Sequence, residues 1–266
     1  MAMTKYFTKT FKPDIVNGTI GNVIQSDTTD LAFANGDILF DWHAIDMPRG
    51  IFNLVNTTIY MVGEDGANQA NLDLTLVFAK SIDGVAPLSL GSVNAAPSGS
   101  FTAPQHIIGA TKLEASANGI GQVTLGHGTV YYGNVSGNNG TNGMCVLSPE
   151  SESGSLTKSG FSGLNKLYVA AICESAGPDF STGVLSSAGV SDDSTNDITV
   201  KTVDVRKAFQ PGDIVYIHDV NTAIGTVSSV PDDTSLILTS NNVGAISTND
   251  EFINATPITV TLNFEQ

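Results

Sequence analysis

The chain of 266 residues has little positive charge, with 11 Lys or Arg against 26 Asp or Glu and a formal net charge of −15. No Lys or Arg follows Lys207, whereas the segment 208–266 holds seven acidic residues. A basic face for nucleic acid or anionic lipid cannot be assembled from so few cations. We therefore expect neither a nucleic-acid nor a membrane partner, and we interpret the acidic surface as an ordinary solvated one.

Long apolar runs and cysteine are also scarce. The longest fully apolar run, 167–173, is far too short to cross a bilayer, and no apolar stretch follows the basic N-terminus to form a signal peptide. The two cysteines, Cys145 and Cys173, each lie in an apolar run, which favours buried free thiols over a disulfide. These features predict synthesis in a reducing cytoplasm.

Helical periodicity is nearly absent, and a period of two takes its place. Apolar and polar residues alternate over 72–78 and again over 258–264, as expected for strands with one face on a core and one in water. Further strands are predicted at 38–42, 52–62, 105–109, 122–132 and 167–173, the last of them central because it is apolar on both faces. The pattern predicts an all-β fold with a β-sandwich or jelly-roll-like main domain.

Composition shifts at 186–197, a polar stretch that we interpret as a linker. It is followed by short strand patterns at 198–203, 214–217, 224–230, 235–239 and 251–253, which fit a small SH3-like β-barrel. The expected division is a sandwich domain at 1–188, to which 256–266 returns as a strand, and a small barrel domain at 189–255.

Motifs for catalysis or cofactors are not recognisable. The sequence has no Gly-x-Ser-x-Gly elbow and no Walker loop, and its four histidines are far apart in sequence. Asp41 and His43 could hold a metal, and the oxygen-rich loops 64–68 and 192–197 could hold calcium, but an edge hydrogen bond and solvated turns are the favoured interpretations. We expect no cofactor, no metal and no enzyme activity, with a β-sandwich hydrolase or lyase as the minor alternative.

The basic residues gather at the N-terminus, where 5–12 reads as a basic and aromatic arm that could add to an acidic partner surface. An ordinary first strand with lysines at a sheet edge is the favoured interpretation of this segment. Aromatic side chains elsewhere are candidate interface anchors, although core packing is the favoured interpretation for them. The candidate interface residues are Lys5, Tyr6, Phe7, Lys9, Phe11, Lys12, Trp42, Tyr131 and Tyr132.

Two sets of segments resemble known proteins. The segments 211–217, 225–230 and 232–238 resemble small barrel modules of phage structural proteins, and 47–52 and 76–84 resemble structural proteins of marine, T4-like phages. The resemblance implies a virion structural protein on the capsid surface that decorates or cements the capsid. Its partners would be the major capsid protein or other virion proteins, and it would form homo-oligomers on the particle. The alternative is a tail fibre, a spike or a carbohydrate-binding module.

Overall fold

The computed structural model describes residues 5–15, 33–62, 73–98, 104–113, 122–125, 127–134, 145–150, 164–175, 180, 183–201, 204–217 and 222–266. This part of the chain is all-β, and its helical elements are the short 3-10 turns η2 (Pro104–His106) and η3 (Val205–Lys207). None of the helices in these ranges has the length and apolar character that a membrane crossing requires.

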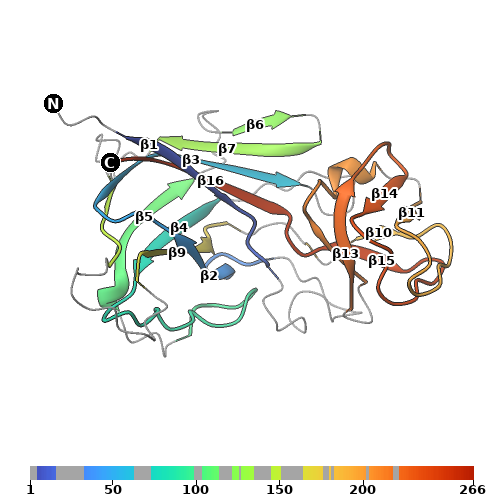
Figure 1. The fold of residues 1–266 in the computed structure, drawn as a ribbon, viewed down its shortest axis with the longest axis horizontal. Coiled ribbons are helices and arrows are strands. Elements are labelled where there is room, and N and C mark those ends of the chain that lie inside the picture. Colours follow the sequence, from blue (N-terminus) through green and yellow to red (C-terminus); the bar gives the residue numbers. More distant parts are fainter. Residues whose placement is uncertain are drawn as a thin grey trace.

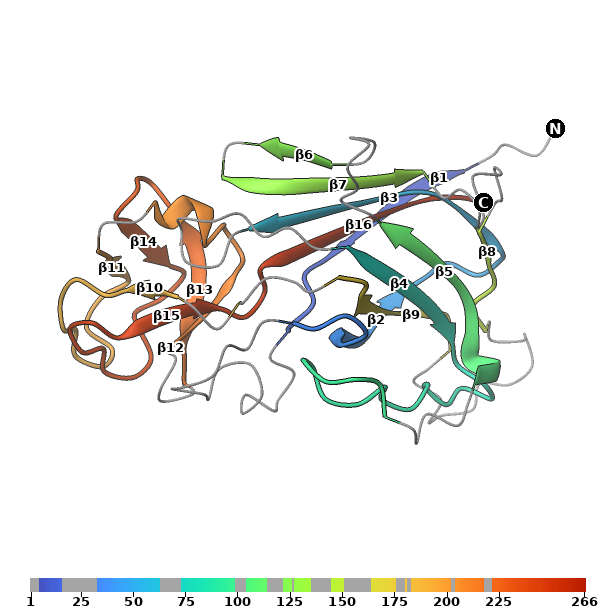
Figure 2. The same ribbon diagram turned by 180° about the vertical axis from the view of Figure 1, so that it is seen from behind.

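A first sheet contains strand β1 (Tyr6–Phe11) at its end. The order continues through β16 (Ile258–Glu265), β3 (Phe52–Val62), β7 (Gly128–Asn134) and β6 (Gln122–Leu125), while β8 (Cys145–Leu147) also pairs with β3. A second sheet has the order β2 (Ile38–Asp46), β9 (Lys166–Cys173), β4 (Leu74–Lys80) and β5 (Ile107–Leu113). The first sheet lies over the second in both views, so the two form a sandwich (Figure 1, Figure 2).

The sandwich core follows from the alternation in the sequence. Every second residue of β16 is buried, and these side chains join one apolar cluster with residues of both sheets. Strand β9 lies between β2 and β4 and is buried over most of its length, so the prediction of a central strand at 167–173 is confirmed. Strand β16 passes between β1 and β3, with Val260 opposite both Phe11 and Ile59.

The remaining strands form a curled sheet beside the sandwich (Figure 1). Its order is β10 (Val184–Leu185), β15 (Glu251–Asn254), β12 (Ile214–Ile217), β13 (Thr222–Ser229), β14 (Ser235–Leu238) and β11 (Asp197–Thr199). The outermost strands also meet, because Ser187 donates its backbone N–H to Thr199 and Lys201 donates to Leu185. We call this the barrel unit. It has its own apolar cluster, which includes Val184, so strand pairing begins before residue 189.

The prediction of a linker at 186–197 is wrong. Ser186 is fully buried, and Val190 bridges to Ile246. Asn242, 1% exposed, explains how so polar a stretch is held: its amide oxygen accepts from the N–H groups of Ser194 and Thr195, and its Nδ2 donates to Ser191. A buried amide satisfies backbone groups that a solvated linker would leave to water.

Two strand predictions also need correction. The segment 122–132 is not one strand but the hairpin of β6 and β7, with Leu125 paired to Gly128. The strand predicted at 105–109 begins only at Ile107, because Pro104–His106 forms a 3-10 turn. The glycines on either side of His127 indicate a turn, but the prediction of one strand over 122–132 gave them too little weight.

Candidate functional site

Strand β1 has one paired edge and one open edge among the described residues. Lys5 and Gln266 exchange both backbone hydrogen bonds, at 3.1 Å and 2.9 Å, and the antiparallel register then runs unbroken from Tyr6–Glu265 to Phe11–Val260. Hydrogen-bonded and non-hydrogen-bonded pairs alternate in such a ladder. The N–H and C=O groups of Tyr6, Thr8 and Thr10 therefore point away from β16, toward the open edge.

The inward face of β1 is built into the sandwich. The Phe7 ring centroid lies 5.3 Å from that of Phe52 and 5.2 Å from that of Phe264, and the Phe11 ring stacks on His43 at 4.5 Å. These contacts correct the arm interpretation for Phe7 and Phe11, because alternation turns both rings toward the core. The segment is an edge strand of a sheet, as the favoured interpretation had it.

The outward face of β1 continues a row of uncharged polar side chains across the sheet. Thr8 Oγ1 donates to Asn263 Oδ1 at 2.6 Å, Asn263 Nδ2 donates to Asn56 Oδ1, and the Thr10 and Thr261 hydroxyls lie 3.1 Å apart. Tyr6, 71% exposed, extends this row toward the N-terminus, where its hydroxyl donates to the Glu265 carboxylate at 3.5 Å. The side chains hold one another in place, so the face is an ordered surface of hydroxyl and amide groups.

Lys9 is the charged residue on the inward side of β1. It lies between Phe7 and Phe11 in the alternation and is half-buried. Asp46 on β2 lies close enough for Lys9 to affect it: a hydrogen bond from Lys166, the charge of Lys166 and, last, the charge of Lys9 lower the pKa of Asp46. An inward-pointing charge at a sheet edge prevents pairing with arbitrary strands.

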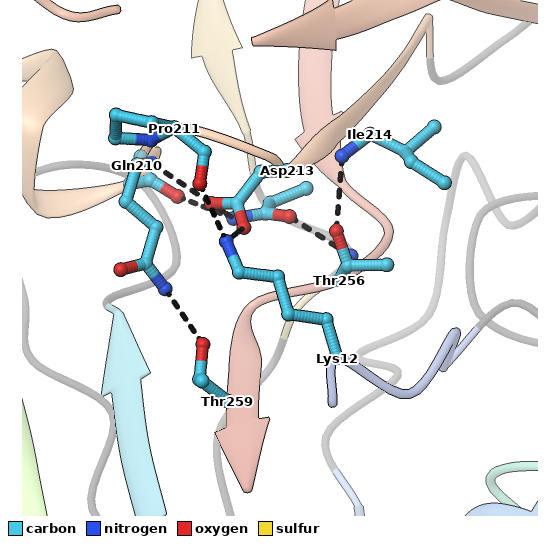
Figure 3. A network of polar contacts seen from close by, with 9 residues as sticks. Lys12, Gln210, Pro211, Asp213, Ile214, Thr256 and Thr259 are labelled. Atoms are coloured by element: carbon cyan, nitrogen blue, oxygen red, sulfur yellow. Dashed lines mark hydrogen bonds and ion pairs between the residues drawn. The ribbon is translucent and has the colours of Figure 1, made fainter. Parts of the chain in front are cut away.

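Lys12, just beyond the end of β1, joins the sandwich to the barrel unit (Figure 3). Its Nζ donates to Asp213 Oδ1 at 2.6 Å and to the Pro211 carbonyl at 2.9 Å. Asp213 is fully buried, and its Oδ2 accepts from Gln210 N at 2.8 Å and from Asn254 Nδ2 at 2.7 Å. The carboxylate thus has a cation and several hydrogen-bond donors, which a buried charge requires.

The sequence around Asp213 explains its position. Asp213 N donates to the Gln210 carbonyl at 3.1 Å across Pro211 and Gly212, and Gly212 has φ +87°. Proline followed by a residue with positive φ is the signature of a type II turn, in which glycine is the favoured second residue. This turn directs the Asp213 side chain to Lys12.

Buried and half-buried polar residues extend this network along the crossing from β15 to β16 (Figure 3). Asn254 Nδ2 also donates to the Ala208 carbonyl at 2.8 Å, Thr256 Oγ1 accepts from Ile214 N at 2.9 Å, and Gln210 Nε2 donates to Thr259 Oγ1 at 3.2 Å. Burial raises the pKa of Asp213 to about 6, against the lowering effects of the Lys12 charge and of the hydrogen bonds. The pKa of Tyr60 on β3 is raised by its own burial and then by the charge of Asp213.

A second contact joins the units at the β6–β7 hairpin. His127 Nδ1 lies 3.4 Å from Asp204 Oδ2, a distance for an ion pair but without hydrogen-bond geometry. Arg206 Nε donates to Asp204 Oδ1 at 2.7 Å, and this bond is the largest cause that lowers the pKa of Asp204. The barrel unit thus contacts the sandwich through two aspartates, one fully buried and one half-buried.

The structure separates the other candidate interface residues from β1. Trp42 is half-buried, donates its indole N–H to the Leu88 carbonyl at 2.8 Å and packs beside Leu90. Tyr131 is 1% exposed and belongs to the core, as the favoured interpretation had it. The Tyr132 side chain lies outside the described residues. Three of the nine candidate interface residues therefore remain available to a partner: Lys5 and Tyr6, which are exposed, and Lys9, which is half-buried on β1.

Asp41 and His43 have separate structural roles. Asp41 accepts from Leu90 N at 3.0 Å, and His43, whose pKa is lowered by burial, stacks on Phe11. Cys173 is a buried free thiol whose pKa burial raises to about 12, while the Cys145 side chain and the loop 64–68 lie outside the described residues. Within those residues no three His, Cys, Asp or Glu side chains gather as a metal site.

A hollow of about 380 Å³ opens beside Lys80, Ile51 and Glu150. The Glu150 carboxylate is already engaged there, since it accepts from Ser81 Oγ and from the N–H groups of Asp83 and Gly84, each at 2.8 Å. Burial would raise the pKa of Glu150, but these donors and Lys80 together hold it below its ordinary value. The carboxylate ties the 82–85 turn to the chain and leaves the hollow without a free acid.

Sequence reasoning missed Asp213, Asn254, Asn242 and Glu150, because their partners are distant in sequence. The Pro211-Gly212-Asp213 turn was the available signal for Asp213. No protein-family model matches this chain, and no curated protein matches it in sequence.

Proposed function

We propose that this chain is a non-enzymatic virion structural protein that binds the capsid surface and decorates or cements it. The observation that carries the proposal is the open edge of β1, a row of backbone donors and acceptors on a strand that is fixed to β16 along its length and to the barrel unit at Lys12. Such an edge adds a neighbouring strand with little rearrangement of the protein that presents it.

The virion setting is supported by the resemblance of the barrel segments and of 47–52 and 76–84 to phage structural proteins. In this proposal the partner is the major capsid protein or another virion protein, and several copies act together on the particle. The sandwich and the barrel unit are held as one body by the Lys12–Asp213 junction, which suits a protein that must bridge neighbouring subunits without bending.

The test uses capsids of the phage that encodes the chain, prepared without this protein. The recombinant chain is expected to cosediment with them and to raise their melting temperature. Thr8→Pro removes an edge-facing N–H while keeping the β16 ladder, so it should lose binding. Val243→Ser, which changes an exposed side chain on the barrel unit, is the matched control. Absence of binding at micromolar concentration refutes the proposal.

A carbohydrate-binding role in a tail fibre or spike is the second candidate. The ordered Thr and Asn row of the outer face supports it, because hydroxyl and amide groups next to an exposed Tyr6 suit a neutral sugar. Saturable binding on a glycan array that is lost in Thr10→Lys, together with no capsid binding, would favour this candidate instead.

A further inference from the structure

We infer that the open edge of β1 accepts an extended acidic segment of a partner protein, with a carboxylate of that segment placed against Lys9. The inference rests on the proposed adhesive role of β1 and specifies the chemistry of the partner. It follows from the backbone register, from the position of Lys9 and from the local charge.

The register determines where a partner strand bonds. Lys5 and Gln266 form a hydrogen-bonded pair, so Phe7, Lys9 and Phe11 direct their N–H and C=O groups to β16. The backbone groups that remain for an incoming strand are those of Tyr6, Thr8 and Thr10. The open edge thus offers a short ladder, and the partner segment needs only enough residues to span it.

The side chains of β1 determine what the partner segment carries. An incoming strand continues the sheet, so its inward-facing side chains lie beside Phe7, Lys9 and Phe11. The Lys9 ammonium would lose water on pairing, and a charge without a counter-ion in that position opposes binding. A partner with an acidic residue between two apolar ones, at alternating positions, supplies both the counter-ion and contacts with the two rings.

The charge around the edge favours the same partner. Lys5 is exposed at the start of β1, and Asp46, the nearby carboxylate, is already paired with Lys166 at 2.6 Å. Lys12 is committed to Asp213. Glu265, opposite Tyr6 on β16, is the carboxylate that accepts from the Tyr6 hydroxyl at 3.5 Å, so Lys5 and Lys9 together still leave an excess of positive charge at the edge of a chain of formal net charge −15. Complementary charge both steers encounter and selects the partner.

The experiment measures peptide binding by NMR with the full chain. The probe is a short blocked peptide of alternating threonine and valine whose central valine is replaced by glutamate, and the matched peptides carry leucine or lysine there. We expect the glutamate peptide to bind about tenfold more tightly than either, and Lys9→Glu to make the lysine peptide the tightest. Lys9→Gln, which does not repel Asp46, should remove the preference for glutamate if Lys9→Glu does not fold.

Amide hydrogen exchange locates the binding. The glutamate peptide should slow exchange at Tyr6, Thr8 and Thr10 and leave Phe7, Lys9 and Phe11 unchanged, because the latter already bond to β16. Equal binding of all peptides, or protection elsewhere, overturns the inference. Concentration-dependent protection of Tyr6, Thr8 and Thr10 without peptide would also overturn it, since a second copy would then be the occupant. Capsid binding without protection of β1 would refute this inference alone, whereas peptide binding without capsid binding would refute the proposed function alone.

Discussion

Lys9 and Lys12 belong to the same short segment but lie in opposite surroundings. Lys9 is on the open edge of β1, half-buried, with Asp46 nearby, whereas Lys12 reaches across to a fully buried carboxylate at 2.6 Å. Lys9 is positioned to pair with a carboxylate of another protein chain, whereas Lys12 pairs with a carboxylate of its own chain. The difference teaches that residue type and sequence position did not decide these roles; the partner that the fold brings to each side chain did.

The largest effect is expected when Lys12 is removed. Lys12→Met leaves Asp213 buried without its cation, which should lower the free energy of unfolding by about 3–4 kcal/mol in urea denaturation at pH 9, three pH units above the Asp213 pKa of about 6, where uptake of a proton does not relieve the buried charge. The double variant Lys12→Met with Asp213→Asn should regain most of this loss, because no buried charge then lacks a partner. A loss below about 1 kcal/mol for the single variant would show that the junction is not a strong link between the units.

The pH dependence of Asp213 gives the next effect. Its folded-state pKa, about 6, lies above the ordinary value of 3.8, so the folded state binds the proton more tightly than the unfolded state. The resulting stabilisation is fully present below 3.8 and is lost as the pH rises through 6. The stability of the wild type relative to Asp213→Asn should therefore increase by about 2 kcal/mol between pH 7 and pH 4.

Carboxylates with lowered pKa values, such as Asp46 and Asp204, make the folded state less stable as the pH falls, and they do so equally in the wild type and in Asp213→Asn. The difference between wild type and Asp213→Asn removes their contribution, so it isolates Asp213. Denaturant titrations across this pH range measure it, and a difference that stays constant with pH would contradict the raised pKa.

Much of the fold could be predicted from the sequence because strands leave a local signal. The alternation in 258–264 and the apolar run 167–173 each report which faces are buried, and both segments are strands in the structure. Where side chains serve long-range partners, the local signal fails. The polar stretch 186–197 looked solvated because its hydrogen-bond partner, Asn242, lies in a distant loop.

The candidate site was predicted only in part, for the same reason. The basic segment 5–12 stood out by composition, but whether a lysine is free or paired depends on a residue about two hundred positions away, as with Lys12 and Asp213. The aromatic residues were a weaker signal for an interface, because an aromatic side chain suits a core as well as an interface. Core packing is what the structure shows for Phe7, Phe11 and Tyr131. Local sequence patterns therefore locate the candidate segment, but they do not distinguish interface residues from core residues.

The smallest effect on stability is expected at Lys9. Lys9→Met should change the free energy of unfolding by no more than about 0.5 kcal/mol. The side chain is at an edge, and its charge is only the last of the effects that lower the pKa of Asp46, whereas Lys12 forms an ion pair with Asp213. Its consequence should appear in association instead. Without an inward-pointing charge the edge becomes a continuous apolar row beside Phe7 and Phe11, which favours pairing with other copies. Sedimentation velocity over a range of concentrations should show larger species in Lys9→Met than in wild type. A large loss of stability with unchanged association would mean that Lys9, like Lys12, is a structural residue and does not protect the edge.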